Sequence, residues 1–152
     1  MTVVVGRLSD AGMCRVVTTA AFDDQDSIHK FLVPSYPPEE PKLVKTDGPR
    51  WARYVQGVVA LMNKEGNVLP FDAVISSSVP LGGGVSSSAA LEVAMCLFVE
   101  QLCPPSTPLS VKGRALLCQQ AEHRYAGMPC GIMDQFVSVM AKEGHALLID
   151  CR

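Results

Sequence analysis

Short runs of β-branched residues mark the first part of the chain, and apolar residues recur at helical spacing in much of the rest. Runs rich in β-branched residues at 2–8 and 14–19 predict two strands, and the turn-forming stretch SDAGM between them predicts a hairpin. The stretch SIHKFLV, residues 27–33, predicts a third strand. Five prolines within residues 34–49 predict a loop without regular structure.

The remaining pattern is mostly helical. Apolar side chains recur every three or four positions over residues 50–64, at Trp51, Tyr54, Val55, Val58, Val59 and Met62. Further along, we expect a strand at 71–79, helices at 86–102, 110–126 and 132–142, and a last strand at 145–150. This order of elements predicts an α+β fold and not a regular parallel βαβ sheet.

The two ends of the sequence both look like strands, TVVVGRL at the start and HALLIDCR at the end. Unpaired strand edges are a liability that complete domains usually cover. We therefore expect the chain to be part of a longer domain.

Composition narrows the class of protein. A chain of 152 residues with 48% hydrophobic and 18% charged residues is typical of one globular domain. A net charge of −2 gives no reason to expect nucleic acid as a partner, and the apolar runs are shorter than the roughly 20 residues of a membrane span. Six scattered cysteines and no visible secretory signal favour free thiols in the cytoplasm over a disulfide framework.

Residues 79–94, VPLGGGVSSSAALEVA, join a predicted strand to a predicted helix. Gly82, Gly83 and Gly84 let the backbone approach a phosphate, and the first turn of the helix offers free N–H groups with partial positive charge. The serines that follow can cap the helix or bind Mg²⁺. The pattern favours an anion site, with a plain glycine turn as the alternative. It lacks the features of a Walker A loop, a dinucleotide fingerprint or a nucleophile elbow.

Two carboxylates flank a helix break in QQAEHRYAGMPCGIMDQF, residues 119–136. Glu122 lies near the end of one predicted helix and Asp134 at the start of the next. Taken alone, Glu122 could be a solvated charge and Asp134 a partner of the helix dipole. Carboxylates on either side of such a break tend to face one cleft. With the glycine loop, they complete the set of groups needed for phosphoryl transfer.

The segment PLGGGVSSSA, residues 80–89, resembles the P-x-x-x-G-L-S-S-S-A motif of the GHMP small-molecule kinases, with Val85 where leucine is usual. RWARYVQGV, QQAEH, GMPCGIMDQF and GHALLIDCR resemble the animal-type galactokinase branch of that family, over nearly the whole chain. The resemblance implies an α+β fold of the GHMP-kinase N-terminal domain, which is of the ribosomal protein S5 domain 2-like type. Residues 1–152 would form an incomplete copy, with a proline-rich loop at 34–49 and an ATP-binding loop at 80–89.

The resemblance also implies an activity, the transfer of the γ-phosphate of MgATP to the C1 hydroxyl of α-D-galactose. Ser88, or alternatively Ser87, would bind Mg²⁺ together with Glu122. Asp134 would be the catalytic carboxylate beside the sugar, which Gly131 would touch through its backbone. The residues expected to surround the ATP phosphates are Gly82, Gly83, Gly84, Val85, Ser86, Ser87 and Ser88.

Trp51 and Tyr54 are expected near the adenine, with helix packing as the alternative for Trp51. Physical chemistry qualifies the role of Asp134, because a carboxylate at a helix N-terminus is held ionised and is a weak base. We expect Asp134 to orient and polarise the sugar hydroxyl as much as to take its proton. The full-length parent is expected to be a cytoplasmic monomer without a nucleic-acid or membrane partner.

The sequence also departs from the family pattern. The N-terminal sugar-binding signature, with its catalytic arginine, the third glycine-rich motif and the C-terminal domain have no counterpart in these residues. We therefore expect little sugar phosphorylation from this chain alone.

Three other interpretations stay open: a galactokinase-like sensor that binds ligand without turnover, another GHMP sugar kinase, and a metal-binding module. The module would use Cys118, His123, Cys130, His145 and Cys151, whose spacings match no closed zinc pattern. A Cys130–His123 nucleophile pair is also conceivable but lacks a recognisable orienting partner.

Overall fold

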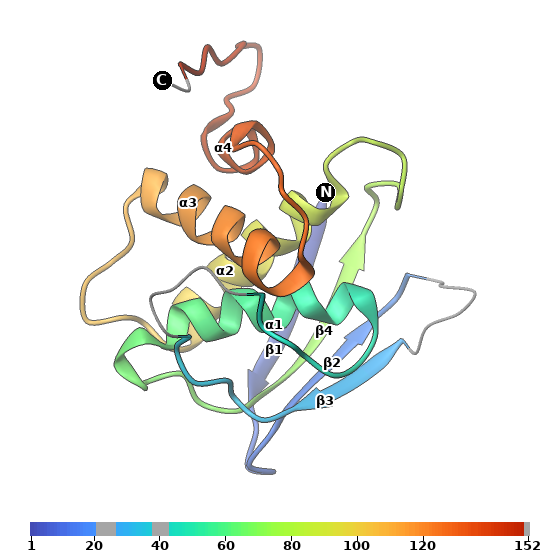
Figure 1. Cartoon of the computed structure of the whole chain (residues 1–152), viewed down its shortest axis with the longest axis vertical. Coiled ribbons are helices and arrows are strands. Elements are labelled where there is room, and N and C mark those ends of the chain that lie inside the picture. Colours follow the sequence, from blue (N-terminus) through green and yellow to red (C-terminus); the bar gives the residue numbers. More distant parts are fainter. Residues whose placement is uncertain (21–26, 38–42, 151–152) are drawn as a thin grey trace.

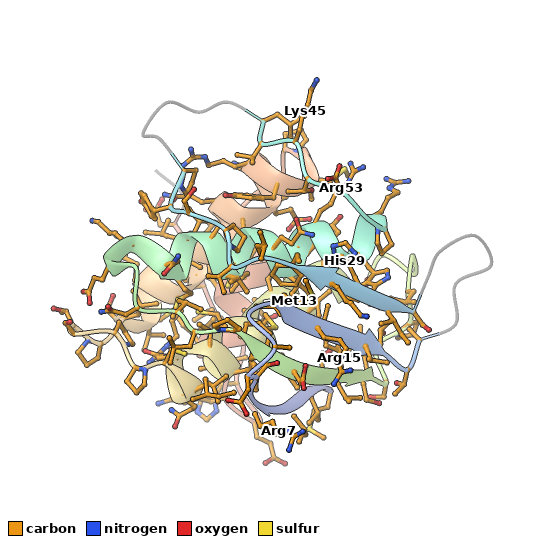
Figure 2. The ribbon with its side chains drawn as sticks, turned by 90° about the horizontal axis from the view of Figure 1, so that it is seen from below. Arg7, Met13, Arg15, His29, Lys45 and Arg53 are labelled. Atoms are coloured by element: carbon orange, nitrogen blue, oxygen red, sulfur yellow. The ribbon has the colours of Figure 1, made fainter. Side chains whose placement is uncertain are left out.

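The computed structural model describes residues 1–20, 27–37 and 43–150. Four strands form one sheet in the order β1-β4-β2-β3. Figure 2 shows this sheet from the face that the helices do not cover. The strands are β1 Thr2–Leu8, β2 Cys14–Thr18, β3 Ile28–Phe31 and β4 Phe71–Ser77. β4 runs antiparallel to β1 and parallel to β2, while β2 and β3 are antiparallel. The strands predicted at 2–8, 14–19, 27–33 and 71–79 are confirmed as β1, β2, β3 and β4.

The predicted hairpin between the first two strands is wrong, because β4 lies between them. β4 buries Phe71, Ala73 and Ile75 at alternate positions, so it contributes a full row of side chains to the core. β4 pairs with β1 on one side and with β2 on the other. The turn stretch after β1 therefore crosses from one side of β4 to the other.

Four helices lie on one side of the sheet (Figure 1). They are α1 Arg50–Met62, α2 Ser87–Leu102, α3 Val111–Ala121 and α4 Met133–Met140. A 3-10 turn, Asn63–Glu65, follows α1, and a π-helical turn, Glu122–Ala126, follows α3. All four predicted helices are confirmed. The described part of the proline-rich segment, 34–37 and 43–49, has no regular structure, as predicted.

The core lies between the sheet and the first two helices. α1 buries Trp51, Val55, Val58 and Val59 on one stripe, as the helical spacing predicted. α3 packs on α1 and α2, and α4 packs on α2 and α3, so α4 lies farthest from the sheet (Figure 1). Three of the described cysteines, Cys14, Cys96 and Cys118, are buried free thiols.

The strand predicted at 145–150 is wrong. Residues 143–150 run beyond α4, away from the sheet (Figure 1), and form no strand in the described part of the chain. The side chain of Leu148 is 97% exposed. An apolar run needs a neighbouring strand to become a β-strand, and none of the described strands is within reach of this segment.

Candidate active site

The loop between β4 and α2 has an unusual backbone. Gly82, Gly84 and Ser86 have φ values of 67°, 67° and 60°, and the two residues between them do not share this positive sign. Alternating conformations of this kind point successive N–H groups into one concavity, a nest that binds anions. The loop predicted to cradle phosphates therefore has a backbone geometry suited to that task.

Ser86 is strained, being the one non-glycine residue with positive φ among those described. Such a conformation costs about 1–3 kcal/mol and is found mainly at functional sites. A Cβ atom placed on Gly82 or Gly84 would meet no atom within 4 Å. These two glycines are thus favoured by their φ values and not by crowding within the described chain.

The start of α2 is open to a ligand. Ser86 precedes the helix, but its side chain makes no capping hydrogen bond to the described backbone. Ser110, by contrast, caps α3 by accepting a hydrogen bond from the N–H of Gly113 at 3.0 Å. The first-turn N–H groups of α2, next to the half-buried Ser87 and Ser88, lack this kind of cap.

A buried acidic cluster lies among α2, the π-helical turn and α4. Glu122 opens the π-helical turn and is 6% exposed, while Glu92 of α2 and Gln135 of α4 are fully buried. Nε2 of Gln135 donates to Oε2 of Glu122 at 2.8 Å and to Oε2 of Glu92 at 3.2 Å. Single π-helical turns are frequent at functional sites, and this one orients Glu122 inward.

Burial and the charge of Glu122 raise the pKa values of neighbouring acidic groups in the cluster. Burial, and next the charge of Glu122, raise the pKa of Glu92 to about 9, so Glu92 is protonated at neutral pH. Burial and then the two carboxylates raise the pKa of Tyr54, which places this α1 side chain near the cluster. Burial and Glu122 raise the pKa of the Cys130 thiol to about 11.

Helix α2 connects the cluster to the glycine loop. Ser88 and Glu92 are four residues apart and therefore lie on the same face of α2, one turn from each other. Long helical side chains lean toward the helix N-terminus, which directs the Glu92 side chain to the Ser88 turn. Gln135 then links Glu92 to Glu122. Ser88 and Glu122 are thus linked through Glu92 and Gln135, and their role as metal ligands stays a prediction.

Asp134 occupies the first turn of α4, as predicted, and is half-buried. It directly precedes Gln135, which fixes this helix to the acidic cluster. Gly131 is exposed, and a Cβ atom there would meet no atom within 4 Å of the described chain. Gly131 therefore has room for a ligand against its backbone, and its contact with sugar stays a prediction.

The two aromatic residues predicted near the adenine differ in their surroundings. Trp51 is 6% exposed and belongs to the hydrophobic core, which favours the packing role that the sequence left open. Tyr54 is half-buried near Glu122 and Glu92. An adenine contact stays a prediction for both, and it is better supported for Tyr54.

Sequence reasoning missed Glu92 and Gln135. A signal for Glu92 was available, because Glu92 and Glu100 are the only charged residues within the largely apolar segment 87–102. A charged residue in a helix that is apolar on most sides, one turn after Ser88, indicates a functional role. No signal marked Gln135, since glutamine is common on exposed helix faces. Its burial depends on how α4 packs.

The alternative sites based on cysteine and histidine are not supported. No group of three His, Cys, Asp or Glu side chains among the described residues is placed to hold a metal ion, and Cys151 lies outside those residues. Nε2 of His123 lies 2.9 Å from the carbonyl oxygen and 3.2 Å from the backbone nitrogen of Cys130, so His123 holds the backbone of the helix break. The raised pKa of Cys130 keeps it a thiol, which is a poor nucleophile.

Comparison with known proteins agrees with this geometry. Residues 53–142 match the model of the GHMP kinases N terminal domain, and the chain belongs to the GHMP kinase family. The chain is 50% identical to galactokinase from Homo sapiens over 153 residues. It is 49% and 47% identical to the galactokinases of Canis lupus familiaris and Bos taurus. Each match covers all of this chain and 37% of the relative, so the chain spans little more than a third of their length.

Two solved structures have the same fold. The galactokinase of Lactococcus lactis complexed with galactose superimposes with a TM-score of 0.67 at 25% identity, covering 89% of this chain and 32% of that one. A D-glycero-D-manno-heptose 1-phosphate kinase from Bacteriodes thetaiotaomicron gives a TM-score of 0.66 at 19% identity over 90% of this chain and 40% of its own. The predicted GHMP-kinase fold is confirmed.

Across the described residues, no helix has both the length and the apolar character that crossing a membrane would need.

Proposed function

We propose that this chain carries part of a galactokinase active site, which transfers the γ-phosphate of ATP to the C1 hydroxyl of α-D-galactose. The overall identity of about half to the mammalian galactokinases supports this substrate pair. The observation that carries the proposal is the continuous connection from the strained glycine loop through α2 to the buried acidic cluster. An anion cradle one helix turn from Glu92, which Gln135 links to the Glu122 carboxylate, suits a nucleotide phosphate and its metal ion.

The residues fit Mg²⁺. This ion prefers oxygen ligands and is usually held by one or two carboxylates together with substrate phosphates. Ser88, or alternatively Ser87, and Glu122 would hold it, and Oε1 of the buried Glu92 has no hydrogen-bond partner in the described chain. When bound, Mg²⁺ neutralises charge on the phosphates.

The chain's own residues would then act by binding and orientation. The N–H groups of the loop Gly82–Ser88 bind the phosphates, helped by the partial positive charge at the start of α2. Asp134, at the N-terminus of α4, accepts a hydrogen bond from the sugar hydroxyl and aligns its oxygen with the γ-phosphate. Since phosphoryl transfer depends mainly on positioning and charge stabilisation, such alignment is the main contribution expected of this carboxylate.

A chimaera tests the proposal. This chain would replace the segment of human galactokinase with which it aligns, and ADP release would be measured with galactose, with glucose and without sugar. Galactose-dependent ADP release that Asp134→Asn abolishes is the expected result. ATP binding without sugar-dependent turnover would indicate a non-catalytic sensor, and turnover with other sugars only would indicate a different GHMP sugar kinase.

Circular dichroism would establish that the chimaera is folded, and calorimetric titration of the 152-residue chain with the non-hydrolysable analogue AMPPNP and Mg²⁺ gives an independent measurement. AMPPNP binding by the folded chain would support the proposal, and a folded chimaera that releases no ADP together with a folded chain that binds no nucleotide would contradict it.

A further inference from the structure

Gln135 makes a connection that the proposed catalytic roles do not use. Its Nε2 carries two hydrogens, and both are donated to oxygens of buried acidic side chains, to Glu122 at 2.8 Å and to Glu92 at 3.2 Å. The Sγ atom of Cys130 lies 3.7 Å from the same nitrogen. One side-chain amide of α4 thereby joins α2 to the π-helical turn after α3.

Stability alone does not account for this arrangement. The side chains of Glu92, Glu122 and Gln135 are all 6% exposed or less. Both Oε1 of Glu92 and Oε1 of Gln135 are buried without a hydrogen-bond partner among the described residues. Buried polar networks with unsatisfied atoms are often no more stable than apolar side chains of the same volume. The network therefore calls for a role other than stabilising the core.

The direction of the contacts suggests that role. Glu92 lies one turn from Ser88 on α2, so its position is fixed relative to the first turn of that helix. Gln135 ties Oε2 of Glu122 to this fixed point. Without the amide, no hydrogen bond among the described residues would join Glu122 to the Glu92 side chain.

We propose that Gln135 is a positioning residue that holds the Glu122 carboxylate in register with Ser88 at the start of α2. This inference rests on the proposed function, because it assigns Gln135 to the geometry of the metal ion that Glu122 and Ser88 would share. Residues that orient metal ligands through hydrogen bonds commonly affect metal affinity about 10–100-fold.

The competing explanation is that Gln135 only anchors α4. Val139 lies one turn further along α4 and packs against the hydrophobic core, without a side-chain polar group. Val139→Ala loosens the same helix and leaves the amide bridge in place. It is the matched control for Gln135→Met, which keeps approximately the volume of glutamine and removes both donors.

The test is Mn²⁺ affinity of the 152-residue chain in the presence of AMPPNP, measured from the free Mn²⁺ signal in electron paramagnetic resonance, with thermal unfolding recorded in parallel. Gln135→Met should weaken Mn²⁺ binding at least about 10-fold, while Val139→Ala changes it less than about 2-fold at a comparable loss of thermal stability. Equal effects of the two variants, or an unchanged affinity in folded Gln135→Met, overturn the inference.

Two further variants complete the design. Gln135→Asn keeps an amide that is too short to reach both acidic side chains. If Gln135→Met does not fold, Gln135→Asn takes its place, and the same weakening of Mn²⁺ binding is expected of it. Glu122→Gln separates the two proposals. If it leaves Mn²⁺ affinity unchanged, or if the wild-type chain binds no Mn²⁺, the proposed metal site fails. If it weakens binding while both Gln135 variants do not, only the positioning role fails.

Discussion

Arg114 of α3 and Glu100 of α2 form a two-point ion pair, with Nε donating to Oε2 at 2.8 Å and Nη2 donating to Oε1 at 3.1 Å. The Glu100 side chain is 9% exposed and that of Arg114 23%. Paired donors and acceptors of this kind are stronger than single contacts and fix the relative orientation of the groups they join. The pair therefore helps to fix α3 against α2. Because α3 leads into Glu122 and α2 begins at the glycine loop, the pair also helps to fix these two parts of the site relative to each other.

Arg114→Ala should lower the free energy of unfolding by about 2 kcal/mol, because it leaves the buried Glu100 carboxylate without its partner. The matched control is Arg15→Ala, which removes the pair between Arg15, labelled in Figure 2, and Asp72 at 2.9 Å on the open face of the sheet. Arg15 is 53% exposed in its side chain, so the loss there should stay below about 1 kcal/mol. Urea unfolding followed by circular dichroism measures both, and equal losses would contradict this ranking.

The helices and the stripe on α1 could be predicted because their signal is local. The spacing of Trp51, Val55, Val58 and Val59 determines a helix and its buried face without reference to other segments. The pairing of β1 was not predictable in this way. Its partner β4 begins more than sixty residues further on, and the turn stretch after β1 fits a crossing over β4 as well as a hairpin.

The candidate site divides along the same line. Gly82, Gly84 and the serines form a contiguous motif whose chemistry is contained in the sequence. The burial of Glu122 and its connection to Glu92 depend on how α2, α3 and α4 pack together. A tertiary contact made through a single glutamine leaves no periodic trace in the chain.

The glycine loop gives the second prediction. Gly84→Val forces a β-branched residue into positive φ and should weaken AMPPNP binding more than about 10-fold by disturbing the nest. Gly66→Val is the control, because Gly66 also has positive φ, 71°, and a Cβ atom there would likewise meet no atom within 4 Å, but it follows α1. Both variants should lose similar stability, and only Gly84→Val should lose nucleotide affinity in calorimetric titration. Equal AMPPNP affinities in the two variants would mean that the glycine loop is a plain turn without a role in nucleotide binding.

The third prediction concerns pH. The folded pKa of Glu92, about 9, lies above the ordinary value of 4.5, so the folded chain keeps a proton that the unfolded chain releases. The contribution of Glu92 to stability is therefore fully present below about pH 4.5 and is lost progressively up to about pH 9. Glu92→Gln removes this dependence, and its advantage over the wild type should grow from about pH 5 to about pH 9, on the order of 1 kcal/mol per pH unit.

Glu65→Gln is the control for that experiment. Hydrogen bonds from Ser106 lower the pKa of this exposed carboxyl, so its contribution is already complete at about pH 5 and is lost only at lower pH. Thermal unfolding of the metal-free chain is measured from about pH 5 to about pH 9. The difference in stability between Glu92→Gln and the wild type should widen as the pH rises, while the difference between Glu65→Gln and the wild type should stay constant. A constant gap for Glu92→Gln would mean that Glu92 is ionised in the folded chain.

The fourth prediction separates the two carboxylates in the galactokinase chimaera. Glu122→Gln removes a ligand charge, so it should raise the Mg²⁺ concentration needed for half-maximal activity about 10-fold or more and leave kcat at saturating Mg²⁺ less affected. Asp134→Asn should instead lower kcat about 10²–10⁴-fold with nearly unchanged ATP affinity, as expected of a group that acts mainly in the transition state. Glu143→Gln, an exposed carboxylate beyond α4, should change neither quantity. The measurements are initial rates of ADP release at varied Mg²⁺ and ATP, with galactose saturating. If both variants weaken only ATP binding, Asp134 has no separate role at the sugar hydroxyl, because losing a group that aligns the hydroxyl must slow the transfer step itself.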